Sequence, residues 1–239
     1  MFQKRPVFRR GAAVAAMSAC CAAAVACSSA ATDPLANMTG KKVATEAVTN
    51  AKAASSLTLT GAVSESGQSY TVNLGIKPGK GCAGTVGEGS KGSFKLVVVD
   101  STVYMQPDNR FWKTTAGSQA AKAIQLFNGK YLKAPAAKSA LSGVSQICDV
   151  SQLFGPDTTA GTIAKQELTT VGGVTVLPLK ASDGSVAYVT DTSKPELVQI
   201  TAPKSSKNGS GKVMVGINSP VTLTAPPAKQ VVDAAKLGM

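Results

Sequence analysis

Cysteine is the residue type with the most chemistry to offer in this chain, which has five cysteines and no histidine among its 239 residues. Without histidine, Ser-His and Cys-His nucleophilic pairs are excluded, and so is the commonest side-chain ligand of transition metals. The sequence also lacks a nucleophile-elbow motif and a phosphate-binding loop motif, and its 13 Asp and Glu residues are scattered. We therefore expect no catalytic residues, no metal site and no cofactor.

Cys27 ends a pattern typical of a lipidated secretory signal. Four basic residues open the chain, an uncharged run of small residues fills positions 11–26, and a polar spacer follows the cysteine. The tetrapeptide Ala24-Val25-Ala26-Cys27 resembles the bacterial lipobox, with Ala24 where leucine is usual. We predict a signal peptide over residues 1–26, lipidation of Cys27, and a flexible tether over 27–40.

Other interpretations of this stretch remain open. The signal is alternatively an ordinary cleaved one with an incidental cysteine, and Cys20 is a poorer candidate for lipidation because the run after it stays apolar. The run is too short and too rich in alanine for a helix that spans a membrane. Arg9-Arg10 leaves the choice between the general and the twin-arginine export route undecided.

Cys82 and Cys148 are the cysteines that remain after signal cleavage and lipidation. Two cysteines in an exported domain are expected to pair, and the bridge would close a long loop worth about 4 kcal/mol on the entropic model. The alternative is a pair of free buried thiols.

The mature chain would carry 21 Lys and Arg against 13 Asp and Glu, a net charge of +8. This charge is spread along the sequence, and aromatic residues make up only 5% of it, so a nucleic-acid partner is not expected. A surface attracted to anionic lipid headgroups or wall polymers fits better, with simple solvation as the alternative.

Hydrophobic periodicity predicts a helix, a meander of strands, a helical insert and a second meander. Helices are expected over residues 41–54, 116–128, 142–154 and 229–237. Strands are expected over 57–63, 70–76, 94–99, 162–171, 174–180, 185–191, 196–202, 211–218 and 221–225. The pattern predicts one α+β domain over 41–237, in which helices cover one face of a curved antiparallel sheet.

This layout resembles the actinobacterial lipoprotein family of LppX, LprA, LprF and LprG, which in turn looks like the carriers of the LolA/LolB fold. The local similarities are the segment Thr102-Val103-Tyr104-Met105 followed by Trp112, and the segment 187–191 followed by 194–197. The glycine-rich stretch around Cys82 and the segment Ile147-Cys148-Asp149 look like streptomycete-type relatives. The likeness covers most of residues 41–225.

The resemblance implies a half-barrel with an apolar cavity between its concave face and the helices. It further implies a protein that binds or carries an acylated lipid without catalysis. From the lipobox we expect an anchor on the outer face of the cytoplasmic membrane, and we expect a monomer. The expected lining of the cavity is Tyr70, Val72, Leu74, Ile76, Leu96, Val98, Val213, Val215 and Ile217. The alternative is a structural or partner-binding envelope protein in which the same residues fill a closed core.

Overall fold

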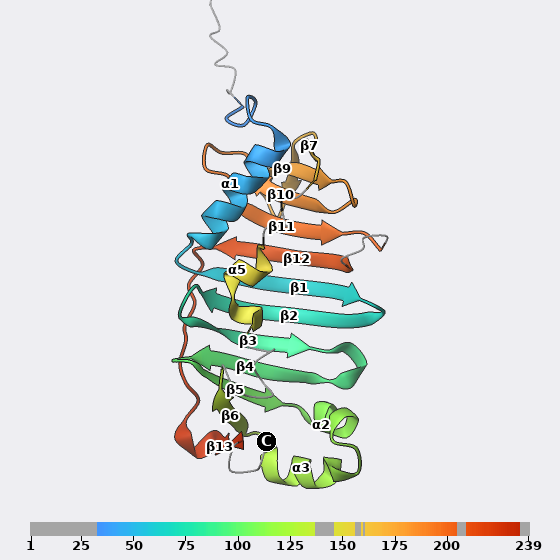
Figure 1. Ribbon diagram of the computed structural model, residues 1–239, viewed down its shortest axis with the longest axis vertical. Helices are drawn as coiled ribbons and strands as arrows, with labels where there is room; N and C mark the ends of the chain where they lie inside the picture. The colour runs from blue at the N-terminus through green and yellow to red at the C-terminus, as the bar shows by residue number, and fades with distance from the viewer. Residues whose placement is uncertain (1–32, 137–145, 156–158, 160, 205–208, 235–239) are drawn as a thin grey trace, which may run out of the picture. The chain divides into compact units, whose positions relative to one another are not determined.

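One large, open sheet organises the part of the chain that the structure describes (Figure 1). The computed structural model describes residues 33–136, 146–155, 159, 161–204 and 209–234. The strands follow the order β13-β6-β5-β4-β3-β2-β1-β12-β11-β10-β9-β7, with β8 paired to β9. Neighbouring strands are antiparallel throughout, except that β13 runs parallel to β6.

The elements have the following bounds. The strands are β1 (Leu57–Glu65), β2 (Gln68–Lys77), β3 (Gly81–Gly87), β4 (Ser93–Val99), β5 (Thr102–Pro107), β6 (Tyr131–Pro135), β7 (Ile163–Lys165), β8 (Thr169–Val171), β9 (Val174–Ala181), β10 (Val186–Thr190), β11 (Leu197–Ala202), β12 (Ser210–Ile217) and β13 (Val231–Asp233). The α-helices are α1 (Gly40–Lys52), α2 (Asn109–Thr115), α3 (Ala120–Phe127) and α5 (Val150–Leu153), and the 3₁₀ turns are η1 (Gly89–Lys91), η2 (Gly117–Gln119), η3 (Gln146–Cys148) and η5 (Ala228–Gln230).

The register of the central strands lines up apolar side chains in rows on one face of the sheet. One row crosses six strands through Ile217, Leu57, Ile76, Cys82, Val98 and Val103. A second row, two residues along each strand, passes through Val215, Leu59, Leu74, Leu96 and Met105. Because side chains alternate between faces along a strand, both rows lie on the same face, and their residues belong to the main hydrophobic core.

Helix α1 covers this apolar face over the strands at the β7 end of the sheet (Figure 1). Its N-cap is Thr39, whose side-chain oxygen accepts a hydrogen bond of 3.2 Å from the Lys42 backbone amide. Val43, Ala47 and Ala51 are fully buried on its inner side. Gly40 permits the close approach to β7, because a Cβ atom there would lie 2.3 Å from the Ile163 carbonyl oxygen.

The middle of the apolar face is covered by the segment that contains η3 and α5. A disulfide joins Cys148 to Cys82 on β3, as the sequence predicts, with 5.3 Å between the Cα atoms. Val150 and Phe154 follow the bridge into the same core, where both are buried. The bridge thus fastens this short segment, which has few backbone hydrogen bonds of its own, onto the sheet.

Helices α2 and α3 pack beside β6 at the opposite end of the sheet. Asp108 caps α2, since its carboxylate accepts hydrogen bonds from the Phe111 amide (2.7 Å) and from the Ser93 amide and hydroxyl (2.9 and 2.8 Å). Burial would raise the pKa of Asp108, but these hydrogen bonds outweigh it and lower the pKa. A second, smaller core forms here around Trp112 and Leu132.

Most of the predicted elements are present, with helix α1 and strands β1, β2, β4 and β9–β12 close to their expected bounds. The expected strand over 162–171 is divided into β7 and β8, between which the Gln166 amide donates to the Pro178 carbonyl at 2.9 Å. The expected helix over 116–128 starts later, at Ala120, and is preceded by α2 and η2. The helix expected over 142–154 is broken at Asp149 into η3 and α5, and its first four residues lie outside the described part.

Two predictions near the C-terminus are wrong. Residues 221–225 form no strand, because this segment runs across the ends of the strands from β12 toward β13 (Figure 1) and Val221 packs against Gly75 of β2. The helix predicted over 229–237 is replaced by η5 and β13 as far as the structure describes it. The β-branched residues Val231 and Val232 are extended instead and pair with Tyr131 and Leu132. This pairing gives hydrogen-bond partners to backbone groups at the edge of β6.

We predict that the Cys82–Cys148 bridge is a major part of the stability of the fold. Replacing both cysteines with alanine removes the constraint on a loop of 66 residues, so the free energy of unfolding is expected to fall by about 4 kcal/mol. Denaturant unfolding of the wild type and the double variant measures the difference. Alkylation of the native protein without reductant is the control, and quantitative labelling of both thiols would contradict the bridge.

Candidate functional site

A pocket of about 500 Å³ lies between helix α1 and the concave face of the sheet at strands β9, β10 and β11. This volume falls within the range of small-molecule sites, which measure about 300 to 1,000 Å³. Ten of its fourteen lining residues are apolar: Ala44, Val48, Ile163, Leu179, Ala181, Val186, Ala187, Val189, Leu197 and Ile200. The pocket therefore suits an apolar ligand.

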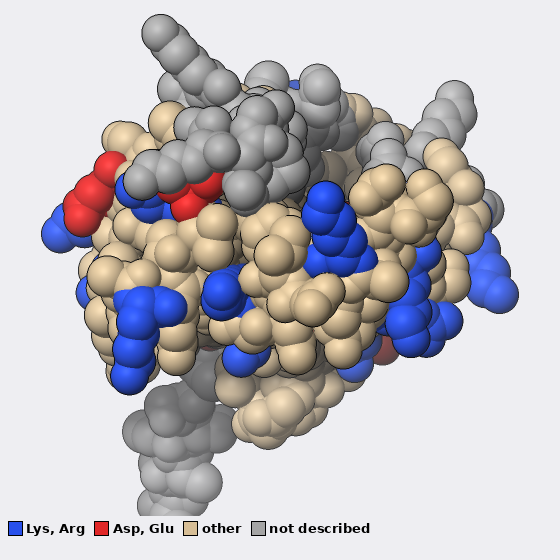
Figure 2. Space-filling model, turned by 90° about the horizontal axis from the view of Figure 1, so that it is seen from below, with Lys and Arg blue, Asp and Glu red and all other residues tan. Residues whose placement is uncertain are grey.

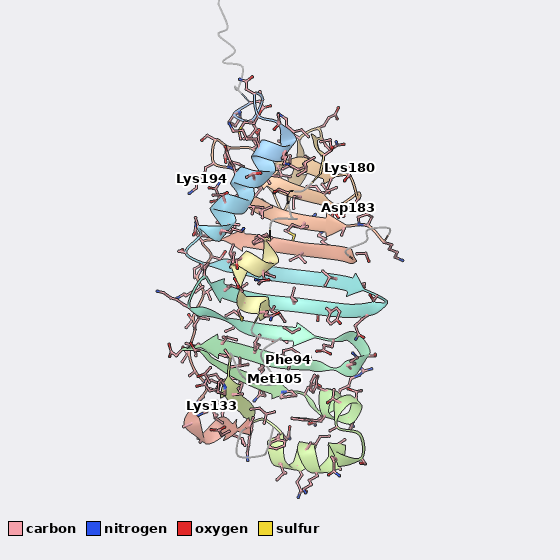
Figure 3. All side chains as sticks on the ribbon, viewed as in Figure 1. Phe94, Met105, Lys133, Lys180, Asp183 and Lys194 are labelled. Atoms are coloured by element: carbon pink, nitrogen blue, oxygen red, sulfur yellow. A yellow bond between two sulfur atoms is a disulfide. The ribbon has the colours of Figure 1, made fainter. Side chains whose placement is uncertain are left out.

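Among the described residues, the polar part of the lining consists of Thr159 and the turn between β9 and β10. In that turn Asp183 accepts hydrogen bonds from the amide and the hydroxyl of Ser185, at 2.9 and 3.0 Å. Figure 3 shows Asp183 and Lys180 at one end of these strands. Lys194 lies at the other end, near α1. The pocket thus has an apolar body and one polar end.

Small residues on facing elements create this space. Ala44 of α1 and Ala187 of β10 both line the pocket, and Ala187 pairs with Leu179 on one side and Ile200 on the other. A short side chain at each of these positions leaves volume that a leucine would occupy. The register between β10 and β11 also shifts at Tyr188/Val189, next to the pocket, and such a shift bends a strand locally.

A second hollow, of about 440 Å³, lies beside the disulfide. Its lining includes Lys52, Asp149, Ser151 and the backbone of Gly79 and Gly81. This hollow is more open to solvent than the pocket under α1, and it adjoins the bridge rather than the helix–sheet gap. We therefore take the pocket under α1 as the candidate site.

The nine residues that the sequence predicts as cavity lining do not line this pocket. All of them lie on the apolar face, on β2, β4 and β12, but toward the middle of the sheet. Leu74, Ile76, Leu96, Val98 and Val215 are buried there, and Val213 and Ile217 pack against the same core, while Tyr70 and Val72 are half-buried beside it. The segment held by the disulfide fills the space above several of them.

Most of the pocket residues lie between positions 159 and 200, where the sequence predicts strands but no lining residue. Their signal in the sequence is weak: it consists of alanines at inward positions of strands and of α1, among larger apolar residues. That signal becomes visible only once α1 is known to lie over β9–β11.

The chain enters the domain at the end of α1 that adjoins β7. Residues 33–39, part of the predicted tether, are folded onto the sheet: Leu35 is fully buried, and the Lys165 ammonium group donates to the carbonyl oxygens of Leu35, Ala36 and Met38 at 2.7, 3.2 and 3.3 Å. The described part of the domain thus includes residues 33–40, which the sequence assigns to the tether.

Asp33 and Asp191 lie side by side at this entry point. Burial, the charge of Asp33 and a hydrogen bond with Asp33 raise the pKa of Asp191, and the charge of Lys165 opposes them. The Oδ1 atom of Asp191 is buried without a hydrogen-bond partner among the described residues. The folded state consequently favours the protonated form of this carboxyl group.

Within the described residues, no group of three or more His, Cys, Asp or Glu side chains is placed to hold a metal ion. Over the same part of the chain, no helix has the length and apolar character needed to cross a membrane.

Comparison with known proteins identifies the fold. No protein-family model and no curated protein matches the sequence. Among solved structures, LprF from Mycobacterium bovis superposes with a TM-score of 0.55 and 14% identity, over 78% of this chain and 96% of LprF. The chain has the fold of LprF. The Mycobacterium tuberculosis lipoprotein LppX aligns at a TM-score of 0.48 and 9% identity, over 77% of this chain and 98% of LppX.

The likeness to LprF confirms the predicted fold class, a curved and mostly antiparallel sheet with helices on its concave face. At 14% identity it extends to the fold alone. Membership of a streptomycete-type branch stays a prediction.

We predict that Asp191 destabilises the folded state as the pH rises. A carboxyl group with a raised pKa in the folded state contributes stability below its unfolded pKa and loses that contribution as the pH rises through its folded pKa. Asp191→Asn keeps a group that can donate to Asp33 but cannot ionise. Its melting temperature relative to wild type is therefore expected to increase from pH 4 to pH 7.

Glu167→Gln, which neutralises an exposed carboxylate in the loop before β8, is the control and should show no such trend. An Asp191→Asn protein that becomes less stable than wild type as the pH rises would contradict the assignment.

Proposed function

We propose that this protein is a membrane-anchored extracytoplasmic lipoprotein that holds the acyl part of a membrane lipid in the pocket under α1 and releases it unchanged. The observation that carries the proposal is the pocket itself, about 500 Å³ of mostly apolar space between a helix and a curved sheet. The fold of LprF and the resemblance to the LppX and LprG family support the same function.

The energetics of acyl-chain burial suit such a site. Each methylene group removed from water contributes about 0.8 kcal/mol, so even part of an acyl chain binds usefully without any specific polar contact. The polar turn at Asp183 and Ser185 then lies where the glycerol or headgroup end of the lipid would remain near water.

Lipidation at Cys27 would hold this pocket near a membrane. Five residues, 28–32, separate Cys27 from Asp33, where the folded domain starts, and six extended residues span at most about 20 Å. Asp33 adjoins the N-terminal end of α1, the helix that covers the pocket. We infer that the protein works on the outer face of the cytoplasmic membrane and takes its ligand from that bilayer.

The proposal includes no catalytic step. The chain lacks histidine, and the described residues that line the pocket include no thiol and no pair of facing carboxylates. A disulfide and a lipid anchor both fit an oxidising, extracytoplasmic site of action.

The alternative, a structural or partner-binding envelope module, is favoured by one observation: the middle of the apolar face is filled by Phe154, Val150 and the disulfide. The two functions differ in what the pocket under α1 does. A carrier uses its volume, whereas a module does not depend on it.

Filling the pocket should therefore remove bound lipid without unfolding the protein. We predict that Ala187→Trp lowers the amount of lipid that copurifies with residues 28–239 by about tenfold or more, as measured by native mass spectrometry followed by organic extraction. The cost in stability should remain under about 1.5 kcal/mol, because the pocket accepts volume that a packed core would not.

Ala62→Trp is the matched control, since Ala62 is exposed on β1 and lies outside the pocket. Ala47→Trp, at a fully buried position of α1 outside the pocket, should instead destabilise the fold. Wild-type protein that carries no lipid and takes up no fluorescent fatty acid would leave the module as the better account.

A further inference from the structure

The end of the sheet formed by β6 and β13 carries an unusual excess of positive charge. From position 109 to 133 the chain has five Lys and Arg residues and no Asp or Glu. Four of them, Arg110, Lys113, Lys122 and Lys130, are exposed and form no salt bridge with a described carboxylate, while Lys133 pairs with Asp233 at 3.7 Å. Figure 2 looks at this end and shows Lys and Arg side chains across it, with fewer Asp and Glu side chains.

Contacts with η1 bring a further cation to the same place. The Thr114 hydroxyl donates to the Lys91 carbonyl oxygen at 2.7 Å, and the Arg110 Nε donates to the Ser90 carbonyl oxygen at 2.8 Å. Lys91 is exposed and so joins the group. The carboxylate of the nearby Asp108 accepts hydrogen bonds from the Phe111 and Ser93 amides.

An exposed leucine stands among these cations. Leu126 on α3 is 47% exposed and lies four residues from both Lys122 and Lys130. Ala123, Ile124 and Phe127 of the same helix belong to the second core around Trp112 or pack against it, whereas Leu126 is not part of that core. The Phe127 and Trp112 rings, 5.5 Å apart, hold α3 in this orientation.

We propose that this surface, made of Lys91, Arg110, Lys113, Lys122, Leu126 and Lys130 and called here the basic end, docks on the anionic surface of a phospholipid bilayer. Cationic side chains around a displayed leucine are the arrangement by which interfacial helices bind anionic membranes: the charges meet the headgroups and the leucine enters the acyl boundary. A single-stranded nucleic acid fits less well, because proteins that bind single strands stack the bases on exposed aromatic rings, and Trp112 is buried.

The basic end is separate from the pocket and from the point where the described chain begins. Ten strand-to-strand steps of about 4.8 Å each separate β6 from β7, where the chain enters the domain. The proposal therefore stands whether or not the pocket holds a lipid, and it gives the protein a second contact with a lipid surface.

The test is cosedimentation of residues 28–239, which lack the signal and Cys27, with vesicles of phosphatidylglycerol and phosphatidylcholine (1:1) or of phosphatidylcholine alone. We expect binding to the anionic vesicles only, weakened as salt is raised. The double variant Lys113→Glu/Lys122→Glu should bind at least tenfold more weakly. Leu126→Gln should bind several-fold more weakly even at low salt.

Controls make the same changes elsewhere. Lys180→Glu/Lys212→Glu alters the charge equally on exposed strand positions, and Leu168→Gln removes a leucine that is as exposed as Leu126. Both should bind within about twofold of wild type. The proposal is overturned if anionic vesicles fail to bind the protein, if the controls lose as much binding as the test variants, or if the basic end binds RNA or heparin but not vesicles.

Discussion

An open sheet with one apolar face has to be covered by its own chain, and this constraint determines the rest of the structure. One apolar row crosses six central strands without interruption, from Ile217 on β12 to Val103 on β5. A barrel would bury such rows by closing on itself, but this sheet remains open. The covering elements come instead from three separate stretches of sequence: α1, the segment held by the disulfide, and the α2–α3 pair.

The three covers differ in how completely they fill the space beneath them, and that difference gives the candidate site. Phe154 and Val150 are large enough to close the middle of the face, and Trp112 with Phe127 closes the β6 end. Helix α1 presents alanines to the sheet and leaves about 500 Å³ uncovered between itself and β9–β11. Small residues on α1 thus have two effects. Gly40 lets the helix approach the sheet closely, and Ala44, one turn further along, leaves space for the pocket.

Alternation of apolar residues predicted the sheet well because a strand exposed on one face repeats every two residues. It placed all nine expected lining residues on the face that the structure buries, yet it did not identify the pocket. Periodicity tells which face is inward but not what lies above each residue, and that depends on contacts such as Asn50 to the Pro195 carbonyl, 145 positions away.

Misassigned elements have a similar cause. Strand β3 has glycine at three of its seven positions and so shows little apolar alternation, although Gly84 is required there because a Cβ atom would lie 2.0 Å from the Asn73 carbonyl oxygen. The stretch before the C-terminus has helical spacing, but the unpaired edge of β6 offers hydrogen bonds that only an extended chain can take, and β13 takes them. In both β3 and β13, pairing with neighbouring strands of the sheet determines the secondary structure.

The central claim is that acyl chains occupy the space under α1. A photoreactive fatty acid, bound to residues 28–239 and crosslinked by light, tests it directly when the labelled peptides are mapped by mass spectrometry. The account predicts labels in the peptides 43–52 and 181–204, which carry most of the pocket lining. Labels confined to the β1–β2 peptide 53–77, or no specific label at all, would contradict it.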